Sequence, residues 1–186
     1  MAYRDYADVD FRRAALVPLM PADVLQVREF CDQVQLIARA NGQKNRYSWD
    51  PTPDEERQRV LVGFLGELAL AKFMAVPYEF ALGYDPARYD VAGHEVRSTQ
   101  RFNGCLITHE TDKPAIYVLA LVHRISYYKF DVVLAGWIDL LDANTPNHWR
   151  TDVRHPAFFT PQTVLHPMGT LRPHTTKATV GTWHFN

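Results

Sequence analysis

The chain has 186 residues, of which 47% are apolar and 22% are charged, with 12 prolines, 9 glycines and 2 cysteines. This apolar fraction, together with 20 basic and 21 acidic side chains, excludes an intrinsically disordered chain. The modest glycine and proline counts exclude a collagen-like chain. The length predicts a single domain that spans residues 1–186. A net charge of −1 does not by itself indicate a nucleic-acid-binding protein.

Several features favour a cytoplasmic location. Residues 1–13 place charged side chains among the apolar ones, so we expect no secretory signal there. No apolar stretch approaches the roughly 18 residues that a membrane-spanning helix needs. We therefore expect no membrane partner. The two cysteines, Cys31 and Cys105, do not make a disulfide framework, which favours a reducing compartment.

Residues 1–50 are predicted to form an N-terminal helical part. Apolar residues recur with helical spacing over residues 22–40, which predicts the first helix. A polar loop follows at 43–51, where basic and aromatic side chains are most densely mixed. Lys44 and Arg46 in this loop are candidate nucleic-acid contacts, and a solvated loop is the simpler interpretation.

A second helix is predicted over residues 52–74. Thr52 and Glu55 form the two ends of a capping box, which marks the start of a helix. Glu67 shares one stripe of this helix with four apolar residues, Val60, Phe64, Ala71 and Met74. An ionised side chain in an inward stripe costs free energy unless it is paired. Glu67 is therefore either an edge residue bonded to a neighbour or a functional acid.

The second half of the chain is predicted to contain strands. Residues 89–91 and 94–99 have the pattern of two short strands around a tight turn. The apolar runs at 115–122 and 131–138 are typical of strands that are covered on both faces. The C-terminal part, 141–186, is rich in Pro, His and Thr and is predicted to wrap the body as extended segments. Helices followed by strands predict an α/β domain in which helices flank a central mixed sheet.

The turn at 92–93 is predicted to gather charged side chains on one patch. Pairing across it places Asp90 opposite Glu95, where two like charges repel each other. Arg97 lies two residues beyond Glu95 and points to the same face, whereas Val96 points into the core. A structural salt bridge from Arg97 to either acid explains this patch as well as a functional site does.

The order of these residues resembles the PD-(D/E)xK nuclease superfamily, of the small phage- or prophage-encoded type. The resemblance covers residues 63–138. It rests on GFLGELALAKF around Glu67, YDVAGHEVRSTQ around Asp90 and Glu95, and the apolar strands YVLALV and VVLAGWI. It implies a restriction-endonuclease-like core and a hydrolase that cleaves DNA phosphodiester bonds. A phage-encoded member would act in the host cytoplasm.

The resemblance also implies a role for each residue of the patch. Asp90, Glu95 and the carbonyl oxygen of Val96 would bind Mg²⁺ or Mn²⁺, and Glu67 would act through a metal-bound water. The metal would polarise the scissile phosphate and lower the pKa of the attacking water. It would also relieve the repulsion between the two opposed acids. Arg97 stands where the family has lysine, and a guanidinium stabilises transition-state charge but is a poor general base.

Alternatives stay open for the function. The polar residues that follow are candidate phosphate contacts, with an ordinary polar loop as the alternative: Ser98, Thr99, Gln100 and Arg101. The departure at Arg97 leaves open a nuclease-like fold with weak or no catalysis that binds DNA or a protein. A third interpretation is a structural phage protein in which the acids and Arg97 form a buried ion network. The oligomeric state is also open, a homodimer included.

Overall fold

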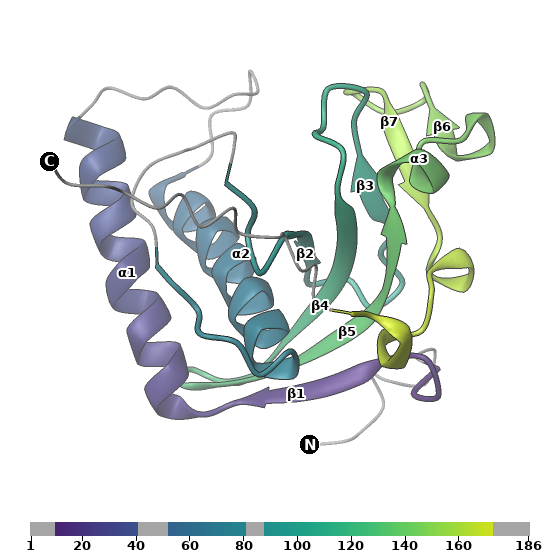
Figure 1. The fold of residues 1–186 in the computed structure, drawn as a ribbon. Helices are drawn as coiled ribbons and strands as arrows, with labels where there is room; N and C mark the ends of the chain where they lie inside the picture. Colours follow the sequence, from purple (N-terminus) through teal and green to yellow (C-terminus); the bar gives the residue numbers. More distant parts are fainter. Residues whose placement is uncertain (1–9, 41–51, 81–87, 173–186) are drawn as a thin grey trace, which may run out of the picture.

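The computed structural model describes residues 10–40, 52–80 and 88–172. Its centre is a four-stranded mixed sheet with the strand order β1-β5-β4-β2 (Figure 1). In chain order these strands are β1 (Ala15–Leu19), β2 (His94–Thr99), β4 (Ile116–Ser126) and β5 (Lys129–Asp139). β2 and β4 are parallel, and the other two pairs are antiparallel. β2 is therefore an edge strand whose inner neighbour is β4.

Two long helices, α1 (Pro21–Ala40) and α2 (Pro53–Phe73), cover one face of this sheet (Figure 1). The apolar side chains of α2 share a core cluster with Val96 of β2 and with Val118 and Ala120 of β4. A fully buried valine or leucine side chain stabilises a fold by about 1.5–3 kcal/mol. This packing fixes α2, and with it Glu67, against the edge strand.

A second sheet lies on the other face of the central one, with the strand order β3-β7-β6 (Figure 1). Its strands are β3 (Leu106–Thr108), β6 (Trp149–Arg150) and β7 (Ala157–Thr160), and the short helix α3 (Leu140–Ala143) follows β5. Tyr117 and Leu119 of β4 turn to this side and form a second core cluster with Leu106. The middle of the central sheet is thus buried on both faces, which explains the near-continuous apolar runs of β4 and β5.

The main sequence predictions of local structure are confirmed. α1 and β2 have the predicted positions, and α2 begins at the predicted capping box. Thr52 accepts a hydrogen bond from the N–H of Glu55, whose carboxylate accepts one from the N–H of Thr52. The two apolar runs form β4 and β5, which extend further than predicted into a hairpin. The predicted fold class, an α/β domain with a mixed sheet flanked by helices, is confirmed.

The prediction of a strand over residues 89–91 is wrong. Only Val91 pairs, in a single antiparallel bridge with His94. The intervening turn is tight, because Ala92 (φ 46°) and Gly93 (φ 85°) both adopt left-handed backbone conformations. This bridge is nevertheless the pairing that brings Asp90 beside the start of β2.

The buried face of α2 includes the apolar residues of the predicted stripe, with Ala71 buried and Val60, Phe64 and Met74 partly buried, but its centre is shifted. The most deeply buried stripe follows Leu61, Leu65 and Ala69, whereas Glu67 is half-buried beside it. This rotation keeps the carboxylate of Glu67 out of the apolar centre, where an unpaired charge would be most costly.

The C-terminal part contains more regular structure than the extended segments predicted for 141–186. Residues 141–172 include β6, β7 and three short 3₁₀ helices, Pro146–His148, Gln162–Val164 and Met168–Thr170. His166 pairs with Trp137 of β5, and the indole N–H of Trp137 donates to the carbonyl of Pro167. No helix in the part of the chain that the structure describes has the length and apolar character that crossing a bilayer requires.

We predict that Gly66→Ala destabilises the protein by about 1–3 kcal/mol. An added Cβ at this position would collide with Ser98 Oγ and lie 3.0 Å from Ala120 Cβ, so α2 would have to move away from the sheet. Gly63→Ala, on the same helix, meets no heavy atom within 4 Å and is expected to stabilise the helix. Urea denaturation of both variants tests this prediction, and equal effects at the two positions would contradict it.

Candidate active site

The carboxylate of Asp90 binds the open edge of β2. The backbone N–H of Val96 donates to Asp90 Oδ2 over 2.8 Å. In a strand, the N–H and C=O of one residue point to the same side. The carbonyl of Val96 therefore faces the same edge as Asp90, which is the arrangement that the predicted carboxylate and carbonyl ligands require.

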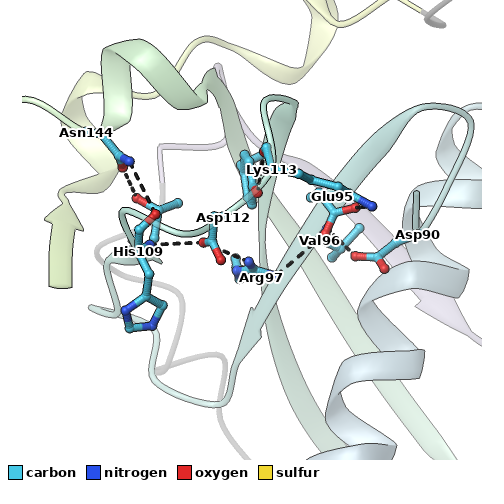
Figure 2. Close-up of polar contacts among 10 residues, drawn as sticks. Asp90, Glu95, Val96, Arg97, His109, Asp112, Lys113 and Asn144 are labelled. Atoms are coloured by element: carbon cyan, nitrogen blue, oxygen red, sulfur yellow. Dashed lines mark hydrogen bonds and ion pairs between the residues drawn. The ribbon is translucent and has the colours of Figure 1, made fainter. Parts of the chain in front are cut away.

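Glu95 lies on the other face of β2 from Val96, within a cluster of charges (Figure 2). Lys113 Nζ lies 2.8 Å from Glu95 Oε1, and a guanidinium nitrogen of Arg97 lies 3.8 Å from Oε2. The Glu95 side chain is only 10% exposed and that of Lys113 only 26%. Water therefore screens this pair less than an ordinary surface salt bridge.

Arg97 is held mainly by a different acid. Its guanidinium lies 2.9 Å from Asp112 Oδ2 (Figure 2). It also lies 5.0 Å from the centre of the Tyr117 ring. The same carboxylate oxygen of Asp112 accepts a hydrogen bond from the backbone N–H of His109, which fixes the loop between β3 and β4. The predicted salt bridge from Arg97 to Glu95 is thus present but longer than the pair with Asp112.

Glu67 reaches the cluster from α2. The hydroxyl of Tyr78 donates a hydrogen bond to Glu67 Oε2 over 2.6 Å. Burial, and then the negative charge of Asp90, raise the pKa of Glu67 to about 8, while the hydrogen bond from Tyr78 opposes that rise. Glu67 therefore lies within electrostatic range of Asp90, and its charge is costly in the absence of a cation.

The other two acids show the same electrostatic pattern. Burial raises the pKa of Asp90, and the hydrogen bond from Val96 counteracts it. Burial and the charge of Asp90 raise the pKa of Glu95, against the opposing effect of Lys113 and Arg97. Three carboxylates thus repel one another in a partly buried place, which is the condition that a bound cation relieves.

The donor chemistry of this cluster suits a hard divalent cation, because Mg²⁺ and Mn²⁺ prefer carboxylate and carbonyl oxygens. Over residues 10–40, 52–80 and 88–172, however, no three His, Cys, Asp or Glu side chains are gathered closely enough to form a metal cage. Glu95 Oε1 is directed to Lys113 and Glu67 Oε2 to Tyr78. A cation would therefore compete with Lys113 for Glu95.

The residues predicted to contact DNA differ from one another in burial and in their hydrogen bonds. Ser98 Oγ lies against Gly66 of α2 and is buried, so it does not face a ligand from this position. Thr99 accepts a hydrogen bond from the backbone N–H of Arg101. Gln100 and Arg101 are exposed. Lys44 and Arg46 lie outside the described residues.

Three residues of the cluster were not predicted from the sequence: Asp112, Lys113 and Tyr78. Lys113 lies three positions before β4, whose first residue pairs with His94 at the start of β2. This position predicts a contact with Glu95 only when β2 and β4 are known to be parallel neighbours. Tyr78 follows a chain reversal at Ala75, whose φ of 53° is uncommon for alanine.

Comparisons of this chain with family models, with curated proteins and with solved structures give no match.

We predict that Glu67→Gln stabilises the protein at alkaline pH in buffer without divalent cations. The pKa of Glu67 is higher in the folded chain, about 8, than its ordinary value of 4.5, so the folded state loses stability as pH rises through this range. The variant keeps an acceptor for Tyr78 but carries no charge.

Thermal unfolding of both proteins from pH 4 to pH 9 measures this effect. The free energies of unfolding of the two proteins should agree near pH 4. Above pH 8, that of Glu67→Gln should be higher by on the order of 1–3 kcal/mol. A difference that does not change with pH would contradict the electrostatic account.

Proposed function

We propose that this protein is a divalent-metal-dependent nuclease of the PD-(D/E)xK type, with a restriction-endonuclease-like core, that hydrolyses DNA phosphodiester bonds. The observation that carries the proposal is the convergence of Asp90, Glu95 and Lys113 at the edge strand β2. Asp90 and Glu95 flank one tight turn, Lys113 comes from the loop before β4, and helix α2 adds a fourth titratable residue, Glu67. Salt bridges alone do not require this many acids in one partly buried place.

The arrangement of α2 and β2 supports the same proposal. Glu67 is carried by the helix that packs directly on β2, and Glu95 by that strand. The acids thus occupy fixed positions on rigid elements, which active sites require for tight positioning. Asp90 is fixed by its hydrogen bond to Val96.

Lys113 supplies the amine that the family has and that Arg97 does not provide. The surroundings of a lysine can shift its pKa so that it exchanges a proton, and its three N–H donors can rotate, whereas a guanidinium stays charged. Arg97 is held by Asp112 and stacks near Tyr117, so we assign it a structural role in fixing the loop that carries Lys113. Lys113 holds Glu95 and would orient the attacking water or donate to a phosphate oxygen beside it.

A bound divalent cation would supply Lewis-acid activation of the phosphate and a more acidic water. Asp90, Glu95 and the carbonyl of Val96 are the groups that would hold it. Glu67 would accept a hydrogen bond from a water at the site. The exposed Gln100 and Arg101, at the far end of β2, would contact the DNA backbone.

A second candidate function is DNA or protein binding without catalysis. The absence of a preformed cage of three acids in the described residues favours it, because a fold that has lost its chemistry has no need to gather them. The ion pair between Lys113 and Glu95 would then be only structural.

Cleavage of labelled single- and double-stranded DNA in Mg²⁺, Mn²⁺ or EDTA distinguishes the two functions. We expect metal-dependent cleavage by the wild type, its loss in Asp90→Asn, and a decrease of about 10²–10⁴-fold in Lys113→Ala. Arg97→Lys keeps a cation for Asp112 and should change the rate only a few-fold.

Glu110→Gln, an exposed acid in the loop that carries Lys113, is the matched control and should cleave like the wild type. DNA binding by a wild type that does not cleave in either metal would favour the binding function. Cleavage that survives Asp90→Asn would assign the activity to another site or to a contaminant.

A further inference from the structure

The segment after α2 returns along the helix and brings Tyr78 beside Glu67. The backbone N–H of Val76 donates to the carbonyl of Ala71, and that of Ala75 to the carbonyl of Lys72, which closes the helix end. Ala75 adopts a left-handed conformation with φ of 53°, a strain of about 1 kcal/mol for a residue other than glycine. The reversal places residue 78 near a helix position eleven residues earlier.

Aromatic packing fixes the ring of Tyr78. It meets Phe80 edge to face with the ring centres 4.7 Å apart, and Phe80 in turn lies 4.9 Å from Phe30 of α1. Phe30 contacts Phe64 of α2 at 5.0 Å. The hydroxyl is thus positioned by the helix pair itself and not by a mobile side chain.

The hydrogen bond to Glu67 differs in kind from the contacts of Glu95. Tyr78 is neutral, so it occupies Oε2 of Glu67 without cancelling the negative charge. Glu95, in contrast, is paired with two cations. None of the ion pairs among the described residues includes Glu67. The hydrogen bond from Tyr78 uses Oε2, and the hydrogen bonds of the described residues include none to Oε1.

We propose that Tyr78 is a positioning residue that orients Glu67 by a hydrogen bond to Oε2, so that Oε1 and the full negative charge face a cation or its bound water. This inference rests on the proposed nuclease function. Arg88 acts on Glu67 as a weak opposing positive charge, while Asp90 and Glu95 add negative charge from β2 and the turn before it. Glu67 is thus held by a neutral hydroxyl while two further acids act on its carboxylate.

A double-mutant cycle of Tyr78→Phe and Glu67→Gln tests this inference. The full-length proteins are titrated with Mn²⁺ alone by calorimetry, and the Mg²⁺ dependence of DNA cleavage is measured in parallel. Loss of a group that orients a metal-site ligand costs about 10–100-fold in metal affinity or activity. We expect Tyr78→Phe to weaken Mn²⁺ binding about tenfold and to add no further loss in the Glu67→Gln background.

Two measurements keep the result interpretable. Thermal unfolding should show that Tyr78→Phe remains folded, since Phe keeps the ring packing, and Tyr128→Phe, an exposed hairpin residue, should behave like the wild type. Additive losses in the two variants, or unchanged Mn²⁺ binding in Tyr78→Phe, would overturn the positioning role while leaving the nuclease proposal intact. A wild type that neither binds Mn²⁺ nor cleaves DNA would instead overturn the nuclease proposal and this inference with it.

Discussion

The parallel pairing of β2 with β4 is the constraint on which the charge cluster depends. Because His94 pairs with Ile116, the loop before β4 begins beside Glu95 at the same end of the sheet. Lys113 can therefore reach Glu95, and Asp112 can reach Arg97. An antiparallel arrangement of these two strands would carry the loop to the opposite end and remove Lys113 from Glu95.

Around this pairing the protein balances a costly set of like charges. Burial disfavours the ionised forms of Glu67, Asp90 and Glu95, and the charge of Asp90 adds to this effect at Glu67 and Glu95. A backbone N–H, a phenol and an ammonium each stabilise one carboxylate, so the fold tolerates the cluster without bringing the acids into one cage. Such incomplete compensation is typical of functional sites, where stability is given up for chemistry.

The sequence predicted those parts of the site that local rules determine. A tight turn and the alternation of a strand were sufficient to put Asp90, Glu95 and Arg97 near one another and Val96 in the core. The helix periodicity found Glu67, although the buried stripe is rotated away from it. Lys113 and Tyr78 were not predictable in this way, because their positions depend on strand order and on a chain reversal at a non-glycine residue. The strands of the second sheet, two to four residues each, are too short to show an alternating apolar pattern.

The most direct test of the account is a crystal of the full-length protein grown with Mn²⁺ and measured for its anomalous scattering. We predict a manganese peak between the carboxylates of Asp90 and Glu95, beside the carbonyl of Val96, with Lys113 Nζ displaced from Glu95. A crystal at saturating Mn²⁺ that shows no peak there and retains the Lys113–Glu95 ion pair would contradict it. The cluster would then be a structural ion network.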